Sequence, residues 1–513
     1  MHFAFGETST DDRMIIATTL QQAGRYAHAS IRLPLDDIAG EGAAIVALAP
    51  MLLVVAVWNR FPLIYYDTGA YVLEGLGDHF LVERSPVYSL FLRVAGAGFS
   101  LWTIIILQAV ACAFVMVECA RGLVPKLSLG LFLALGAGLI VATGLPWYVG
   151  QVEPDCFAAL AVLSIYLLAF HAGPLGPTRR HLLLAIGSFA GAVHSSHLLL
   201  AAGLWLSLAL YLAIRSLATS NAGWPKLRLA EPAIMIAITV SLVISANFVF
   251  TRQIFVSRAG PSFVFARLLQ DRIVSRLLDE TCPRSGYRLC EYKDVLPPTA
   301  NAWLWSSYSP FVKLGGFDGT RAESAKIVWD SLARYPLWNL EMAFADAGRQ
   351  LFAFKTGDQV EPQQWAVGPT LTHFLPSQID GYLSARQQLG QIDFRTVNRV
   401  HVPIGYLSLL LLVVSLALAL WRAEQQASLF LSMVVLSLLG NALICGALSN
   451  PHDRYQSRLI WLAPFAVALV AASWEATRKN IAMKTDVTES SNPPQYSAYE
   501  TSEPLAGEGR IRH

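Results

Sequence analysis

Charged side chains are scarce in this sequence. Asp, Glu, Lys and Arg make up 14% of its 513 residues, whereas 54% are hydrophobic, and the mean hydropathy is +0.46. A soluble domain is typically about a quarter charged. Because so few charges cannot cover the water-facing surface of a chain this long, a soluble globular protein is excluded. The composition therefore predicts an integral membrane protein.

Several familiar signals are also missing from the sequence. About forty mostly polar residues precede the first apolar run, which argues against a secretory signal peptide. There is no Walker sequence, Rossmann glycine pattern or serine nucleophile elbow. The apolar runs carry no interior charges of the kind that line ion or proton pathways. Nothing therefore points to ATP hydrolysis, a redox cofactor or a nucleic-acid partner.

Runs of roughly 17–25 apolar residues, the length that crosses a bilayer, predict an all-α polytopic protein with about ten transmembrane helices. One run, residues 181–213, is long enough for two helices, and we divide it at the polar cluster His194-Ser-Ser-His197. The ten predicted spans are 43–58, 102–120, 127–145, 155–171, 181–197, 198–214, 231–250, 401–421, 427–448 and 457–474.

The distribution of Lys and Arg orients these spans, because cytoplasmic loops carry an excess of basic residues. With both termini in the cytoplasm, the basic residues in or beside the inner loops are Arg121, Lys126, Arg179, Arg180, Arg215, Lys226, Arg228, Arg422, Arg478 and Lys479. The short outer connections, residues 144–154 and the turn at His194, hold neither Lys nor Arg. The pattern predicts a multi-pass protein with its active face on the outer side of the membrane. The missing signal peptide and the pair of cysteines on the outer side suit a bacterial inner membrane, whose outer face is periplasmic.

The predicted spans divide the chain into five parts. Two are transmembrane modules, and the others are two cytoplasmic ends and one large outer segment. In order they are a cytoplasmic extension (1–41), a transmembrane module (42–250) with a site loop at 60–88, an outer segment (251–400), a second transmembrane module (401–476) and a disordered cytoplasmic tail (477–513).

The outer segment is expected to be mostly helical. Apolar residues at three- and four-residue spacing over 265–278 and 325–354 predict amphipathic helices. Cys282 and Cys290 stand close together there and could form a local disulfide if that face is an oxidising periplasm; two unpaired thiols are the alternative. The four other cysteines fall in or beside spans, where they are expected to be small apolar residues.

Carboxylates beside the predicted spans are the sharpest chemical signal. The 60–88 loop is too long, acidic and aromatic for a simple linker, and its Asp67 lies only a few residues past the first span. Glu153 and Asp155 lie at the start of the fourth span. A carboxylate near the bilayer is usually paired, solvated or functional. We expect Asp67 and Asp155 to share one outer cavity, as a general base plus a metal or sugar ligand. The alternative is a set of solvated loop charges, with Asp155 as a helix N-cap.

The remaining acidic residues of this loop are interpreted as ordinary loop charges. They are Glu74, Asp78 and Glu83.

Basic residues on the same predicted face form a second signal. Arg84, Arg454 and Arg458 could bind a phosphate or pyrophosphate through their planar guanidinium groups. Interfacial anchoring is the alternative. His194 and His197 would share a helix face, which allows metal ligation or simply a polar turn. A divalent metal is possible, but no metal ligand is assigned and no cofactor is demanded.

The order of these features resembles the GT-C membrane glycosyltransferases, the group that holds protein O-mannosyltransferases and the lipid A aminoarabinose transferase. Tyr66-Asp67 and Arg84-Ser-Pro86-Val-Tyr88 stand where that family has an acidic first outer loop followed by an Arg-Pro-rich start of a re-entrant helix. Leu107-Gln-Ala109 through Arg121, and then Pro154-Asp155, are similar to its later motifs.

The resemblance implies a GT-C-like fold and transfer of a sugar from a polyprenyl-phosphate donor to a glycan, lipid or protein acceptor on the outer face. Asp67 would be the general base, and Asp155, with Glu153, would lie across the same cavity. Arg84 is expected to bind the lipid phosphate by its motif position. Arg454 and Arg458 are assigned the same role from their sidedness alone, and Tyr66, His194 and His197 are further site candidates. A lipid-linked saccharide transporter or flippase, or an envelope assembly subunit, remains the alternative.

Overall fold

The computed structural model describes residues 35, 38–77, 79–124, 126–217 and 227–490. Most of these residues are helical, none of them belongs to a named strand, and a parallel bridge pairs Leu63 with Gln151. The prediction of an all-α polytopic membrane protein is confirmed. Asp78, most of the predicted N-terminal extension and the last part of the predicted tail lie outside the described residues.

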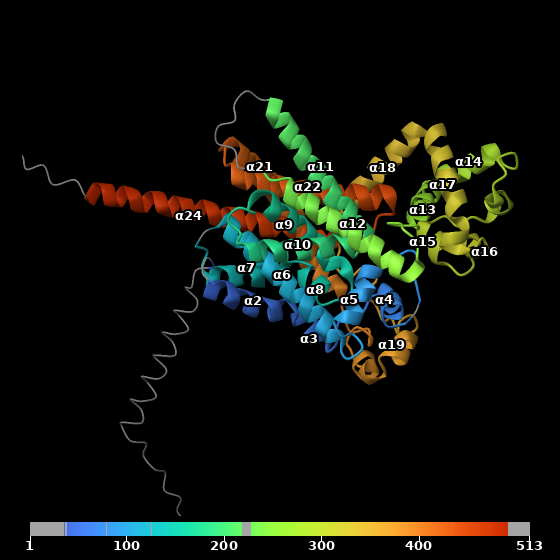
Figure 1. Cartoon of the computed structure of the whole chain (residues 1–513), viewed down its shortest axis with the longest axis horizontal. Helices are drawn as coiled ribbons and strands as arrows, with labels where there is room; N and C mark the ends of the chain where they lie inside the picture. Colours follow the sequence, from blue (N-terminus) through green and yellow to red (C-terminus); the bar gives the residue numbers. More distant parts are fainter. Residues whose placement is uncertain (1–34, 36–37, 78, 125, 218–226, 491–513) are drawn as a thin grey trace, which may run out of the picture.

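Among the described residues, seven helical segments are long and apolar enough to cross a membrane. Each coincides with a predicted span (Figure 1). Five are single helices: α6 (Leu101–Leu123), α11 (Ser195–Leu217), α12 (Ala230–Thr251), α21 (Phe394–Trp421) and α22 (Gln425–Leu448). Two are formed by consecutive helices. The segment Ala39–Asn59 combines α2 (Ile38–Leu52) with α3 (Val54–Asn59), and Asp453–Lys479 combines α23 (Asp453–Ile460) with the first part of α24 (Leu462–Ser490).

The three other predicted spans coincide with shorter helices, so the count of ten stays a prediction. These are α7 (Leu129–Ala142), α9 (Phe157–Phe170) and α10 (Pro177–Ala192), of 14, 14 and 16 residues. A 14-residue helix is about 21 Å long, shorter than the ~30 Å hydrocarbon core. α9 is buried along almost its whole length. Composition alone cannot separate such a central helix from a lipid-facing span.

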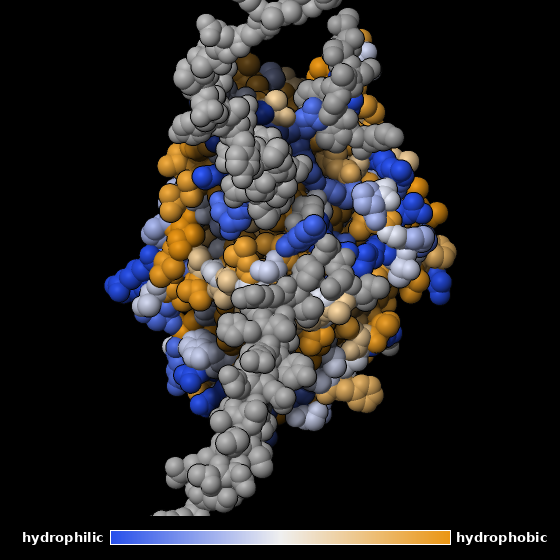
Figure 2. All heavy atoms as spheres, turned by 90° about the vertical axis from the view of Figure 1, so that its left-hand side faces the viewer, coloured by the Kyte–Doolittle hydropathy of each residue, from blue (hydrophilic) through white to orange (hydrophobic). Residues whose placement is uncertain are grey.

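The bundle has a small ionic cluster at the end where α2 and α10 begin and α6 ends. Arg121 Nη1 lies 3.0 Å from Glu41 Oε2 and 3.2 Å from Glu118 Oε1, and Arg179 pairs with both carboxylates. Figure 2 views the molecule from this side, and orange hydrophobic residues reach its flanks. Leu206, Leu210 and other large apolar residues of the long helices are indeed exposed, as expected for helices that face lipid.

The predicted site loop is largely helical and lies at the opposite end of the bundle. It contains α4 (Tyr66–Leu76) and α5 (Pro86–Val94). Thr68 starts α4 by accepting the backbone N–H of Tyr65 at 2.9 Å. Pro86 occupies the first turn of α5, where its missing N–H costs nothing. α8 (Leu145–Val149) and the 3₁₀ turn η1 (Pro154–Cys156) complete this end.

Residues 251–400 divide between two hydrophobic cores rather than forming one unit. The first part has its own core, with Trp303, Phe265 and Phe311 at its centre, and lies at the right of Figure 1. We call it the side subdomain. Its helices are α13 (Gly260–Gln270), α14 (Ile273–Thr281), η2 (Arg288–Val295), α15 (Ala300–Trp305), α16 (Pro310–Lys313) and α17 (Gly316–Arg334).

The second part of that segment joins the main core through Phe354, Val367 and Leu371. Its elements are the end of α18 (Pro336–Leu351), α19 (Gly368–Phe374), η3 (Pro376–Gln378) and α20 (Ile379–Leu383). The first half of α18 packs against the side subdomain instead, through Trp338 and Met342. The predicted amphipathic helices are each interrupted once, at Arg272, which has φ +62°, and at Tyr335-Pro336. At the other end of the chain, α24 continues to Ser490, inside the predicted tail.

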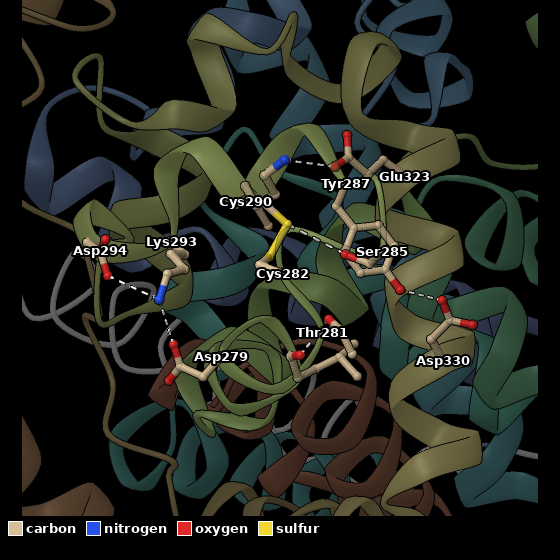
Figure 3. Close-up of a disulfide and its surroundings, with 12 residues drawn as sticks. Asp279, Thr281, Cys282, Ser285, Tyr287, Cys290, Lys293, Asp294, Glu323 and Asp330 are labelled. Atoms are coloured by element: carbon tan, nitrogen blue, oxygen red, sulfur yellow. Dashed lines mark hydrogen bonds and ion pairs between the residues drawn. A yellow bond between two sulfur atoms is a disulfide. The ribbon is translucent and has the colours of Figure 1, made fainter.

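A disulfide joins Cys282 at the end of α14 to Cys290 in η2, as the sequence allowed (Figure 3). The turn that it closes is also tied to α17, because the Leu289 N–H donates to Glu323 at 2.9 Å and Tyr287 pairs with Asp330. The disulfide therefore fixes the edge of the side subdomain.

Replacing both cysteines by Ser should destabilise the side subdomain by about 2–3 kcal/mol, because the bond restricts a short loop in the unfolded chain. Limited proteolysis at 282–295 measures the effect, and the expected result is faster cleavage than in the wild type. Reductant should reproduce that change in the wild type and do nothing to the Ser variant. An unchanged cleavage rate in the variant would show that the disulfide contributes no stability.

Candidate active site

Backbone pairing joins the two loops that carry the predicted acidic residues. The Leu63 N–H donates to Gly150 O at 2.9 Å, and the Val152 N–H donates to Leu63 O at 3.0 Å. Thr68 then donates its hydroxyl to Val152 O at 2.9 Å. This short bridge sets the first turn of α4 beside the segment 151–155. Asp67 is therefore held close to Glu153 and Asp155, although more than 80 residues separate them in sequence.

A third segment adds the arginines. Arg454 and Arg458 lie one turn apart on α23, so both point to the same side of that helix. Arg454 Nε is 2.6 Å from Asp155 Oδ2, and Arg458 Nη1 is 2.8 Å from Asp155 Oδ1. The side chains of Asp155 and Arg458 are both 0% exposed. Burying such charges is costly unless they are paired. Asp155 therefore supplies the negative charge that makes the burial of both arginines possible.

Arg454 is the centre of the cluster. Its guanidinium also lies 3.3 Å from Asp67 Oδ2 and 3.4 Å from Glu153 Oε2, and it covers the Tyr65 ring at 4.0 Å from the centroid. Through its other carboxylate oxygen, Asp67 pairs with Arg84, whose Nη2 lies 2.7 Å from Asp67 Oδ1. Asp67 thus bridges two guanidinium groups. With 23% of its side chain exposed, it is the most accessible carboxylate of the cluster.

A cavity of about 1140 Å³, which includes open solvent at its mouth, lies against the cluster. Asp67, Glu83, Arg84 and Arg454 are the charged residues of its lining, which also includes Tyr71, His194 and several serines. The apolar part of the lining comes from α11, α22 and the side subdomain. Its large residues are Leu199, Ile444, Leu448, Phe263, Val264 and Trp305. A mostly apolar cavity with a few convergent polar groups is the usual form of a ligand site.

Charges of both signs meet at the cavity. Burial raises the pKa of Glu153 well above its usual value, although Arg454 opposes the shift, and Glu153 Oε1 has no hydrogen-bond partner among the described residues. Two carboxylates, Asp67 and Glu83, and two guanidinium groups, Arg84 and Arg454, line the cavity. The two guanidinium groups are the ones that an anion in the cavity could meet.

Five of the predicted site residues do not line the cavity, namely Tyr66, Glu153, Asp155, His197 and Arg458. Tyr66 is 44% exposed and packs against Trp365, with ring centroids 6.0 Å apart. Its neighbour Tyr65 contacts Arg454 instead, because α4 begins at Tyr66 and turns successive residues to different sides. Asp155 contributes no atom to the cavity lining, and its contacts are those of a residue that positions Arg454 and Arg458.

The two histidines lie at the start of α11. His194 lines the cavity, and its Nδ1 is 2.8 Å from Ser196 Oγ. His197 is buried, with Nδ1 3.0 Å from Ala190 O. The part of the chain that the structure describes contains no group of three His, Cys, Asp or Glu residues arranged for a metal. The geometry around the histidines therefore supports a polar turn rather than a metal site.

Glu74 is the residue that sequence reasoning misjudged, since it is fully buried rather than an ordinary loop charge. Its Oε1 accepts the Leu81 N–H at 3.0 Å, and its Oε2 accepts the Ser89 hydroxyl at 2.6 Å. These bonds hold the segment that carries Arg84. Asp67, Tyr71 and Glu74 follow the spacing of one helix face, a signal that could have indicated the burial.

Glu74 should make stability depend on pH. Burial raises its pKa to about 7, from about 4.5 in the unfolded chain. Between these values the folded protein keeps a proton that the unfolded chain has lost, so stability falls as pH rises, by at most about 3 kcal/mol. Melting curves from pH 5 to pH 8 should show this fall in the wild type and a smaller one in Glu74→Gln. Equal pH dependence in both would contradict the assignment.

The site thus offers the partly exposed carboxylate of Asp67 between two guanidinium groups, in a cavity whose lining is otherwise largely apolar apart from Glu83 and several serines. Proton acceptance and phosphate binding are the chemistry that these groups can supply. Comparisons of the chain with protein-family models, with curated proteins and with solved structures found no match.

Proposed function

We propose that this protein is a GT-C-like glycosyltransferase that moves a sugar from a polyprenyl-phosphate donor to an acceptor at the outer, periplasmic face of the membrane. The observation that carries the proposal is the position of Asp67, Arg84 and Arg454 together in the lining of one cavity. A lipid-linked phosphate fits such a cavity, because guanidinium forks bind phosphate and the apolar lining residues of α11 and α22 suit a lipid chain.

In this proposal Arg84 and Arg454 bind the donor phosphate and stabilise the negative charge that builds up on it as it leaves. Asp155 and Arg458 do not touch the substrate. They hold Arg454 in place, since Asp155 accepts from both arginines at 2.6 and 2.8 Å. This role replaces a direct catalytic one for Asp155.

Asp67 is the proposed general base. An acceptor hydroxyl attacks the anomeric carbon, the bond from that carbon to the phosphate oxygen breaks, polyprenyl phosphate leaves, and the proton passes to the Asp67 carboxylate. Both oxygens of that carboxylate face guanidinium groups at 2.7 and 3.3 Å. A donor phosphate competes for the same N–H groups and so releases the carboxylate. The donor is therefore expected to bind before the acceptor is activated.

Donor binding tests the proposal first. Arg84→Gln is expected to weaken binding of polyprenyl-phosphate sugars by about tenfold to hundredfold, the effect of losing a charge-assisted hydrogen bond. Arg276→Gln, at an exposed arginine of the side subdomain with 63% of its side chain accessible, is the matched control and should bind like the wild type. Titration of the purified protein in nanodiscs measures both. Equal affinity of Arg84→Gln and the wild type would refute the phosphate-binding role.

Sugar transfer itself is measured in proteoliposomes that contain a panel of polyprenyl-phosphate sugars and acceptors. Release of polyprenyl phosphate that depends on both protein and acceptor supports the glycosyltransferase. Movement of the intact lipid-linked sugar across the bilayer, without any release of polyprenyl phosphate, would support the transporter alternative instead.

A further inference from the structure

Helix α18 has its polar and apolar faces reversed relative to a water-soluble helix. Its buried positions are polar, namely Asn339, Asp346 and Gln350. On the opposite side, Leu337, Leu340 and Phe344 are 80%, 54% and 63% exposed. At 100° per residue the centres of the two sets lie about 130° apart. We call the exposed set the apolar stripe of α18.

Part of the polar face of α18 holds the helix to the protein. Asn339 donates to Ser331 O of α17 at 3.1 Å. Gln350 makes two hydrogen bonds with the His452 backbone, donating to its carbonyl at 2.8 Å and accepting from its N–H at 2.9 Å. Asp346 pairs with Arg349 of the same helix, and Asn339 Oδ1 and Asp346 Oδ2 have no hydrogen-bond partner among the described residues. The bonds of Asn339 and Gln350 to neighbouring segments fix the orientation of α18 about its axis.

Helix α18 packs beside two candidate membrane spans, α21 and α22. The backbone of Asp346 comes so close to α22 that a Cβ on Gly446 would lie 2.7 Å from it, and Gly446 is two residues before α22 ends. Directly after α18, Phe352 stacks on Tyr406 of α21, with ring centroids 6.1 Å apart. Tyr406 is half-exposed, as are Leu439 and Leu443 of α22.

We propose that α18 lies at the boundary between lipid headgroups and acyl chains, with its apolar stripe in the bilayer. The occupant of this surface is lipid, because the stripe continues the exposed apolar surface of α21 and α22 at the level where α22 ends. The charged groups around it, Arg334, Glu341 and Arg349, are exposed at its ends and edge. That arrangement is typical of helices that lie in the membrane interface.

This placement also links the bilayer to the site. Gln350 holds the backbone of His452, two residues before Arg454, whose N–H bonds to Asp358 at 3.2 Å. The membrane-embedded helix thus supports the segment that presents Arg454. The inference stands apart from the proposed glycosyl transfer, because it rests on the reversed faces of α18 and its neighbours alone.

Spin labelling in lipid nanodiscs tests the placement with the full chain. Single nitroxides are attached at Phe344→Cys and, as a second variant, Leu340→Cys, with exposed Arg321→Cys of α17 as control. The native thiols interfere little, since four are buried and two form the disulfide.

The expected result is high relaxation enhancement by oxygen and loss of enhancement by a water-soluble nickel complex at 344 and 340, with the reverse at 321. Nickel access at 344 and 340 equal to that at 321 would overturn the proposal. Protection from both reagents together with spin–spin broadening would also overturn it, since a second copy of the chain would then cover the stripe.

Discussion

Asp67→Asn is expected to lower the rate of sugar transfer by about 10²–10⁴-fold, the usual contribution of a general base. Asn keeps the shape of the side chain but cannot accept the proton of the acceptor hydroxyl. The fold should survive, because Arg84 also packs over the Tyr71 ring and Arg454 keeps Asp155 as its buried partner. Initial rates of polyprenyl phosphate release in proteoliposomes measure the effect.

The same substitution at an exposed aspartate is the control. Asp294→Asn changes a side chain that is 86% exposed in the side subdomain, and it should transfer sugar at the wild-type rate. Melting temperatures of both variants establish that they are folded. If folded Asp67→Asn turned over at the wild-type rate, Asp67 would not be the base.

Asp155→Asn is expected to cost about 3–5 kcal/mol of stability, the penalty for leaving a buried charge without its partner. Arg458 is 0% exposed, and its close carboxylate contact is Asp155. Removing the arginine as well, in Asp155→Asn with Arg458→Met, should recover part of the loss because no uncompensated charge then remains. Chemical unfolding in detergent micelles measures both variants.

This experiment separates a positioning role from a catalytic one. If Asp155→Asn lowered stability by less than about 1 kcal/mol and yet abolished sugar transfer, Asp155 would act in catalysis and the buried ion pairs would not explain its presence. The expected result is instead a large loss of stability, with a loss of transfer that follows the displacement of Arg454.

Local sequence information was sufficient to locate the helices, but it could not show how they pack against one another. Apolar runs located α2, α6, α11, α12, α21 and α22, since the requirement to satisfy the backbone in lipid leaves little choice but helix. The same runs could not show that α9 is enclosed by other helices, because a buried helix and a span have the same composition. Nor could they show that residues 251–400 divide between two cores.

The residues of the candidate site could be predicted from the sequence, but their arrangement in space could not. Charge distribution and loop position singled out Asp67, Arg84, Glu153, Asp155, Arg454 and Arg458, and the structure brings all six together. The pairing of Leu63 with Gln151, which sets Asp67 beside the second loop, has no local signal. The sequence singled out Tyr66, whereas its neighbour Tyr65 contacts Arg454. Which of the two faces Arg454 depends on where α4 starts, and helix ends are the least certain feature of a sequence-based prediction.

The central claim is that Asp67, Arg84 and Arg454 form one site for a lipid-linked phosphate. A cryo-electron microscopy structure with a polyprenyl-phosphate sugar tests it most directly. We expect phosphate oxygens about 2.7–2.9 Å from guanidinium nitrogens of Arg84 and Arg454, with the Asp67–Arg84 ion pair opened. A phosphate bound outside this cavity, with that ion pair intact, would contradict the account.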